Sequence, residues 1–167
     1  KPQRLPDFDY ATAGAYFVTI CVRARKNVLG EIRGETAVYS DLGIIVAEAW
    51  FDLPEHYSDI QLDEFIVMPN HVHGIIWIHG RSPNADTVGE GLRPSPTDTD
   101  RPYGLPEIIR AFKSFSARAI NTHQRTRGPF WQRGYHEHII RNDDDLHQHR
   151  AYIRNNPLKW TLDEYYV

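Results

Sequence analysis

The sequence predicts an α+β domain in which helices pack on an antiparallel sheet. Short segments dense in β-branched and aromatic residues alternate with longer amphipathic segments, a pattern typical of this class. Two of the short segments, 60–68 and 71–78, are separated only by Pro69 and Asn70, so they are close enough to pair antiparallel. The length of 167 residues fits one domain with a core of its own.

The N-terminal part supplies a first strand, a hairpin and a helix. Residues 16–22 are rich in aromatic and β-branched side chains and predict a buried strand. Residues 28–40, with glycines at the turn points, predict a short hairpin. Ser40 then supplies an N-cap for an apolar helical run over 44–53, which Pro54 is expected to help end.

The central helix is expected to begin at Leu105, because Pro106 suits a first helical turn. Its apolar residues share one arc: Ile108, Ile109, Phe112, Phe115, Ala119 and Ile120. Its polar residues share the other: Arg110, Lys113, Ser114 and Asn121. This division predicts an amphipathic helix with one face in the core. A fourth strand is predicted at 135–141.

A last helix is expected to follow that strand. Asn142 is a good N-cap, and the three aspartates after it lie where the helix dipole favours negative charge. Pro157 should end the helix, so that Tyr152 lies in its final turn and Asn156 is biased out of α geometry.

The element order is therefore β-(hairpin)-α-β-β-α-β-α. It predicts a ferredoxin-like antiparallel sheet (βαββαβ) with helices on one face and an extra C-terminal helix that carries Tyr152. Residues 79–104 are dominated by Gly, Pro, Ser, Thr and Asp, and they predict a flexible insertion inside a single domain spanning 1–167.

Composition excludes several classes of protein. No apolar stretch approaches the ~18–20 residues of a membrane span, and no signal-peptide pattern is present. Cys21 is the single cysteine, which excludes an internal disulfide and cysteine-based zinc sites and fits a reducing cytoplasm.

The net charge of −3 conceals a segregation of charge along the chain. Residues 35–64 carry eight Asp or Glu and no Lys or Arg, whereas 105–133 carry six Lys or Arg against Glu107 alone. The second segment predicts a basic surface able to follow a phosphate backbone.

Two pairs of residues predict a site for phosphoryl transfer. His71 and His73 project from the same side of a strand, with backbones roughly 6.6–7 Å apart, so both imidazoles can bind one ion. Tyr152 and Asn156 lie at i and i+4 on one helix face, where they place a hydroxyl beside a third metal ligand. Such a histidine pair is a weak signal by itself, since His136 and His138 form another, and Tyr152 alone fits a packing role equally well.

Three motifs, taken in order, resemble the HUH single-tyrosine transposases, and most of all their REP-associated tyrosine transposase branch. They are 68–74 (MPNHVHG), 130–135 (FWQRGY) and 152–159 (YIRNNPLK). The resemblance implies that His71 and His73 are the metal pair, that Tyr152 is the nucleophile and that Asn156 is the third ligand, where related branches often carry Gln. Patterns typical of rolling-circle initiators and relaxases are absent.

The resemblance implies a metal-dependent single-stranded DNA endonuclease and strand transferase that acts on hairpin-forming, REP-like DNA. Mg²⁺ or Mn²⁺ is the cofactor that the mixed nitrogen and oxygen ligands and the family favour. Attack by the Tyr152 hydroxyl would give a 5′-phosphotyrosine and a free 3′-OH, and a second 3′-OH could rejoin the strand without ATP. The location implied is the bacterial cytoplasm, in association with the nucleoid.

Two other functions stay open from sequence. One is a nucleic-acid-binding ferredoxin-like module without cleavage activity, and the other is a metal-dependent phosphodiesterase that uses water, for which Tyr152 is dispensable. Candidate DNA contacts are Arg110, Lys113, Arg118, Arg133, His138 and Arg154. No membrane partner is expected, and both a homodimer and a lone chain are open. Tyr165 and Tyr166 are expected to be tail residues rather than nucleophiles.

Overall fold

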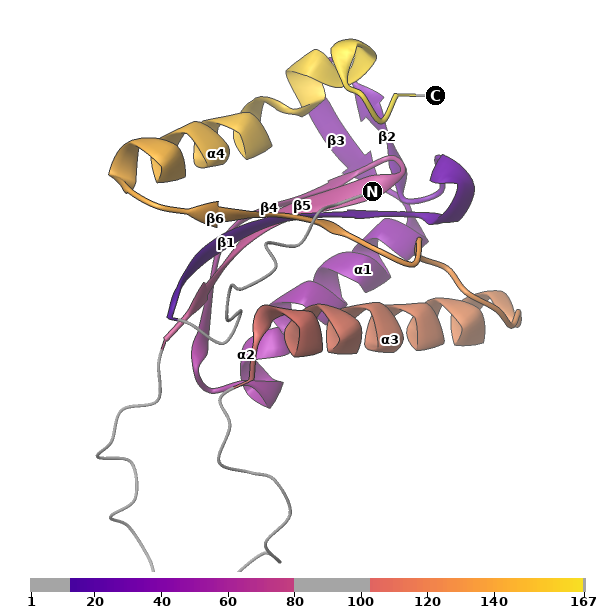
Figure 1. Cartoon of the computed structure of the whole chain (residues 1–167). Coiled ribbons are helices and arrows are strands. Elements are labelled where there is room, and N and C mark those ends of the chain that lie inside the picture. The colour runs from indigo at the N-terminus through magenta and orange to yellow at the C-terminus, as the bar shows by residue number, and fades with distance from the viewer. Residues whose placement is uncertain (1–12, 80–102, 167) are drawn as a thin grey trace, which may run out of the picture.

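The computed structural model describes residues 13–79 and 103–166, and it confirms a mixed α+β fold with an antiparallel sheet (Figure 1). Nearly all of the insertion expected at 79–104 lies outside the described residues. The strands are β1 (Gly14–Cys21), β2 (Gly30–Arg33), β3 (Thr36–Tyr39), β4 (Ile60–Met68), β5 (His71–Ile78) and β6 (His136–Ile140). The α-helices are α1 (Asp41–Phe51), α2 (Leu53–His56), α3 (Leu105–Gln124) and α4 (Asp143–Asn155), with 3₁₀ turns η1 (Arg23–Arg25) and η2 (Pro157–Leu162).

The main sheet has four strands in the order β4-β5-β1-β6, and β2 and β3 form a separate hairpin. Every neighbouring pair is antiparallel. Helices α1 and α3 cover one face of the sheet, and α4 lies over the other face (Figure 1). The register places Thr19 of β1 between His73 of β5 and His136 of β6.

The alternation of side chains along the strands divides the apolar residues between these two faces. The face toward α1 and α3 holds a large core, in which Tyr16, Val18, Val72 and Ile76 are completely buried. The face toward α4 holds a small cluster formed by Ala15, Phe17, Ile75, Leu146 and Ile153. The residues of β5 that point away from the main core therefore face α4.

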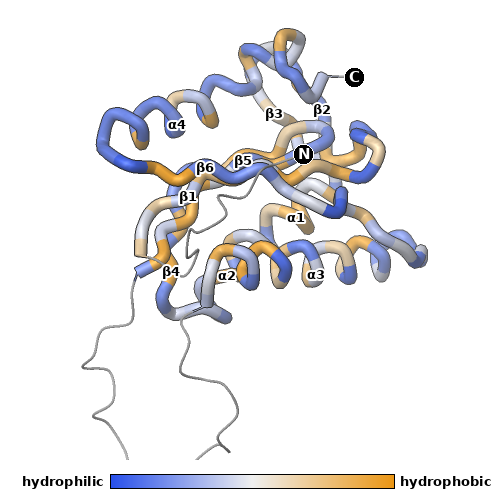
Figure 2. The backbone as a smooth tube through the Cα atoms, in the orientation of Figure 1, coloured by the Kyte–Doolittle hydropathy of each residue, from blue (hydrophilic) through white to orange (hydrophobic). Residues whose placement is uncertain are grey.

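Helix α4 is held to the sheet by few apolar side chains. It buries Leu146 and Ile153, and its remaining surface is largely hydrophilic (Figure 2). Polar contacts supplement this packing: the Arg150 guanidinium donates to both carboxylate oxygens of Asp63 on β4, at 2.9 and 2.6 Å. The position of the tyrosine-bearing helix thus depends on specific polar contacts as well as on burial.

Gly74 allows strand β5 to approach the main core closely. A Cβ atom at this position would lie 2.3 Å from Cζ2 of Trp50, which is completely buried. Any side chain at this position would have to displace the Trp50 indole. Glycine is therefore needed here for β5 to pack closely against the main core.

Two expectations about prolines were wrong. Helix α1 ends at Phe51, and Pro54 lies in the first turn of α2, where its missing N–H is not needed. Asn156 has α geometry (φ −60°, ψ −40°), because the chain continues into η2 with Pro157 in its first turn. The restriction that proline places on the preceding residue is a preference, and here helical continuation prevails.

The apolar arc predicted for α3 was wrong at Ala119 and did not include Ser116. Ala119 is exposed, whereas Ser116 is completely buried. The Ser116 hydroxyl donates to the Phe112 carbonyl at 2.7 Å and accepts from Trp131 Nε1 at 2.9 Å. A polar residue is tolerated in the core here because both of its hydrogen-bonding roles are satisfied.

Within the described part of the chain, no helix combines the length and the apolar character that a membrane crossing requires.

Candidate active site

Strand β5 brings the two predicted imidazoles together on the face that α4 covers. His71 and His73 are 0% and 1% exposed, and their Nε2 atoms lie 2.9 Å apart. Val72 between them is buried in the opposite core, as the strand alternation predicts. The Nε2 atoms of the two imidazoles are therefore close enough to bind the same ion.

The neighbours of the pair determine which nitrogen atoms are free to bind an ion. The Asn70 amide is oriented by its Nδ2, which donates to the carbonyls of Arg25 and Tyr165. Asn70 Oδ1 therefore accepts, and His71 Nδ1, at 2.8 Å, must donate to it. This leaves a lone pair on His71 Nε2. His73 Nδ1 contacts the Thr19 hydroxyl at 2.8 Å, and a hydroxyl can serve either tautomer. Ring nitrogens held in this way are typical of metal-binding histidines.

Burial keeps both imidazoles neutral near pH 7. It lowers the pKa of His71 from 6.5 to about 3, and the charge of Arg25 acts in the same direction. Burial also moves the pKa of His73 well below its ordinary value, with further contributions from His71 and His136. Neutral imidazole is the form that binds metal, so protons do not compete for the site at physiological pH.

We expect the metal-free protein to lose stability in acid through these two groups. Between the unfolded pKa of 6.5 and the folded pKa of about 3, the unfolded chain binds more protons at His71. The free energy of unfolding is therefore fully retained above pH 6.5 and falls as the pH drops through this window, by about 1.4 kcal/mol per pH unit for one group. Urea unfolding at pH 6.5 and pH 5 should show a smaller loss in His71→Gln than in wild type. An equal loss in both proteins would contradict this origin.

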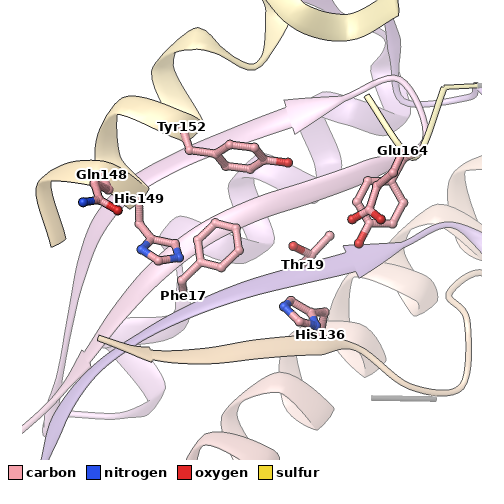
Figure 3. A pocket seen from close by; sticks show the side chains of 8 residues that line it. Phe17, Thr19, His136, Gln148, His149, Tyr152 and Glu164 are labelled. Atoms are coloured by element: carbon pink, nitrogen blue, oxygen red, sulfur yellow. The ribbon is translucent and has the colours of Figure 1, made fainter. Parts of the chain in front are cut away.

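Helix α4 places Tyr152 over the buried pair. Its ring lies edge-on to His73, with centroids 5.2 Å apart, and also contacts Phe17 at 5.9 Å. The side chain is 41% exposed and reaches across a pocket of about 370 Å³, with its hydroxyl directed toward Glu164 (Figure 3). Burial, followed by the charge of Asp163, raises the pKa of Tyr152, and a hydrogen bond from Asn156 opposes this. The hydroxyl is accessible, but the protein alone does not activate it.

Two further side chains are candidates to supply an oxygen ligand, Asn156 beside Tyr152 and Asp163 beside the pair. Asn156 is 2% exposed, and among the described residues its buried Oδ1 has no hydrogen-bond donor. An orphaned buried acceptor is costly, and a bound cation would satisfy it. Asp163, in the segment after η2, has a carboxylate oxygen within 4.8 Å of the ligand nitrogens of His71 and His73. The set of two imidazoles with an amide or carboxylate oxygen fits a divalent cation.

The C-terminal segment packs beside the imidazoles, so the expectation that Tyr165 is a mere tail residue was wrong. The Tyr165 ring lies 4.7 Å from His71 and 6.2 Å from His73, centroid to centroid. Arg25 donates to the Glu164 carbonyl at 2.9 Å, which helps to hold the segment there. Burial, together with the negative charge of nearby groups, raises the pKa of Tyr165. A second phenol therefore lies at the site that Tyr152 was expected to serve alone.

The predicted DNA contacts do not form one surface. Those on or near α3 lie on the opposite face of the sheet from α4, the helix that carries Tyr152 (Figure 1). On that face Arg110 and Arg133 line a pocket of about 330 Å³. Arg118 lies over the Phe115 ring at 5.1 Å. The Lys113 ammonium is half-buried and donates to the carbonyls of residues 132–134, so it stabilises the loop before β6 rather than remaining free for phosphate.

The remaining two predicted DNA contacts lie on the α4 side and already have partners. Arg154 pairs with Glu64 of β4, and His138 Nε2 lies 2.9 Å from the Asp145 carboxylate. The acidic and basic segments are also less separate than expected, because α1 packs beside α3 (Figure 1).

Comparison with known proteins finds relatives that match most of the chain. No protein-family model matches the chain. An uncharacterized protein of Haemophilus influenzae is 34% identical over 98% of this chain and 91% of its own length. A second H. influenzae protein, named "Putative REP-associated tyrosine transposase", is 27% identical over 90% of this chain and 74% of its own length. The chain is related over most of its length to a protein named as a REP-associated tyrosine transposase.

Solved structures agree with this relation at the level of the fold. A REP-associated tyrosine transposase bound to a REP hairpin superposes with a TM-score of 0.64, at 19% identity, over 97% of this chain and 77% of that one. A Deinococcus radiodurans protein named "putative transposase" superposes with a TM-score of 0.50, at 16% identity, over 92% and 96% of the two chains. The relation to a protein named as a REP-associated tyrosine transposase indicates a transposase-like function, which among tyrosine transposases is that of a DNA-cleaving enzyme.

Proposed function

We propose that this chain is a metal-dependent single-stranded DNA endonuclease and strand transferase that acts on hairpin-forming, REP-like DNA through a 5′-phosphotyrosine at Tyr152. The observation that carries the proposal is the position of a half-exposed phenol over two buried, neutral imidazoles. Ring contacts join these three groups, from His71 to His73 on β5 and from His73 to Tyr152 on α4, although about eighty residues separate β5 from Tyr152 in sequence.

His71 and His73 would hold the cation through Nε2, with Asn156, Asp163 or both as oxygen ligands. Oxygen ligands next to a phosphate favour Mg²⁺ or Mn²⁺. When bound, the cation supplies charge neutralisation for the scissile phosphate. The fit rests on the orphaned Asn156 oxygen and on the way that Asn70 and Thr19 hold the outer nitrogens.

Tyr152 supplies the attacking oxygen. Its phenolic oxygen forms a bond to phosphorus, and the 3′-oxygen of the preceding nucleotide leaves with the bonding electrons, so that the downstream strand remains joined to the protein. The phenolic proton must depart, and the carboxylates of Asp163 and Glu164 are near enough to raise the pKa of Tyr152, so either is a candidate acceptor. A 3′-hydroxyl that attacks the phosphotyrosine reverses the step and joins the strand.

The proposal assigns the whole chain to one HUH-type catalytic domain of the ferredoxin-like class. The sheet order β4-β5-β1-β6, with α1 and the short α2 before β4 and α3 before β6, supports this class. We further propose that Tyr152 acts within its own chain. Arg150 and Arg154 bind α4 to β4 of the same chain, so a homodimer is not needed to complete the site. A cytoplasmic protein associated with the bacterial nucleoid is the corresponding location.

The hairpin partner is proposed from the neighbour that is bound to a REP hairpin. A hairpin oligonucleotide library with randomised single-stranded flanks and a 3′ label tests it, since a 5′-phosphotyrosine retains the 3′ portion of the strand. We expect a labelled protein band that survives denaturing electrophoresis when Mn²⁺ is present and disappears with EDTA. Cleavage without a labelled protein would favour the water-using phosphodiesterase, and binding without cleavage would favour the binding module.

A further inference from the structure

A second group of metal-binding side chains lies at the start of α4, outside the site around His71. Asp145 and His149 are one turn apart on the helix, and His138 reaches them from β6. His138 Nε2 lies 3.1 and 2.9 Å from the two carboxylate oxygens of Asp145. His149 Nδ1 lies 2.9 Å from the backbone carbonyl oxygen of Asp145 and 3.1 Å from its Oδ1. Two imidazoles therefore converge on one carboxylate.

The spacing of these atoms suits a small cation. One ligand atom from each residue lies within 4.8 Å of the others. In a tetrahedral site with metal–ligand bonds of ~2.0–2.1 Å, ligand atoms are about 3.3 Å apart. The observed nitrogen–oxygen distances would need to open by only a few tenths of an ångström. All three side chains are accessible from outside, with side-chain exposures of 41% for His138, 21% for His149 and 19% for Asp145.

The surrounding structure already holds these residues in place. The Asp145 backbone N–H donates to the Asn142 cap at 2.9 Å, and the Arg141 N–H donates to Asp145 Oδ2 at 3.1 Å. The two imidazole rings are stacked, with centroids 4.5 Å apart and planes at 20°. The Phe17 ring lies 4.8 Å from that of His149. For both imidazoles to bind one ion, the His149 ring would turn out of this stack and its Nδ1 would exchange the Asp145 carbonyl for the ion.

We propose that His138, Asp145 and His149 form a second cation site, which binds Zn²⁺ or a similar transition-metal ion. Two imidazoles and one carboxylate are ligands that suit Zn²⁺, whereas Mg²⁺ prefers a shell of oxygen atoms. Three protein ligands leave a position open to water or to a phosphate oxygen. The inference is independent of the proposed DNA cleavage, because no residue is shared with the His71 and His73 pair.

The ion would fix the helix that carries the nucleophile. Asp145 lies in the first turn of α4, and Tyr152 follows seven residues later on the same helix. Since α4 buries only Leu146 and Ile153, a metal link from its first turn to β6 adds a strong constraint at an end that otherwise depends on polar contacts. The second site is thus expected to order the helix rather than to take part in phosphoryl transfer.

A metal titration of the full chain tests the proposal. Protein stripped with EDTA is titrated with ZnCl₂ in competition with a chromophoric chelator. Wild type should bind Zn²⁺ at this site in addition to any bound at the His71 pair, and Asp145→Asn and His149→Gln should each lose one equivalent, with affinity there at least ~100-fold weaker. His147→Ala, which removes an exposed histidine of the same helix, should match wild type. Equal stoichiometry and affinity in wild type and Asp145→Asn would overturn the proposal.

Hydrogen exchange supplies a readout that does not depend on counting ions. Zn²⁺ should slow amide exchange across residues 143–152 in wild type and in His147→Ala, but not in Asp145→Asn. The comparison also separates a cation site from a purely hydrogen-bonded cluster, since such a cluster gains no protection from Zn²⁺. Unchanged exchange in wild type on addition of saturating Zn²⁺ would rule out the helix-ordering role.

Discussion

Tyr152→Phe is expected to abolish both DNA cleavage and the covalent protein–DNA adduct, by at least about a thousandfold. The substitution removes only the hydroxyl, so the ring contacts with His73 and Phe17 remain and the fold should be preserved. The measurement is denaturing electrophoresis of the 3′-labelled hairpin library with Mn²⁺. Circular dichroism and thermal unfolding establish that the variant is folded.

The structure supplies a sharp control for this prediction. Tyr165 also lies beside the imidazole pair, so its phenol is a rival nucleophile. We expect Tyr165→Phe to retain adduct formation, because Tyr165 belongs to the C-terminal segment and has no amide one helical turn away, whereas Asn156 hydrogen-bonds Tyr152. Loss of the adduct in Tyr165→Phe alone would reassign the nucleophile. Cleavage without an adduct in Tyr152→Phe would mean that water attacks the phosphate.

Removal of either imidazole is expected to have the second large effect. His73→Ala should reduce cation-dependent cleavage by at least about a thousandfold and weaken Mn²⁺ binding, because the remaining ligands no longer enclose the ion. His73 is almost completely buried, so the variant also leaves a cavity and should unfold at a lower temperature. His73→Gln fills more of that space and separates the two effects. Cleavage that persists in a folded His73→Gln would contradict the metal site.

The third ligand can be identified by the same measurement. Asn156→Ala and Asp163→Asn remove the two candidate oxygen groups one at a time, and Asp163→Asn keeps an oxygen to accept the bond that the Tyr165 N–H makes at 2.7 Å. Since Asn156, of these two side chains, is the one whose buried oxygen has no hydrogen-bond donor, we expect Asn156→Ala to weaken Mn²⁺ binding more. A larger effect of Asp163→Asn would make the carboxylate the principal ligand.

The sequence by itself determined the elements and the faces of this site. Alternation along 71–78 places His71 and His73 on one side and Val72 on the other, and the structure has them so. Ser40 and Asn142 cap the helices at which they were predicted, through bonds to Gly43 and Asp145. These predictions succeed because strand alternation, helical periodicity and capping depend on residues only a few positions apart.

Tertiary structure alone decided which distant groups meet. Nothing in the sequence placed Asp163 or Tyr165 beside the imidazole pair, or joined His138 to Asp145 and His149. Lys113 was predicted to face phosphate, but packing turned its ammonium toward the carbonyls before β6. Such contacts join segments that are far apart in sequence, where neither strand alternation nor helical periodicity can predict which residues meet. These contacts form only when the strands pair and α4 packs on the sheet.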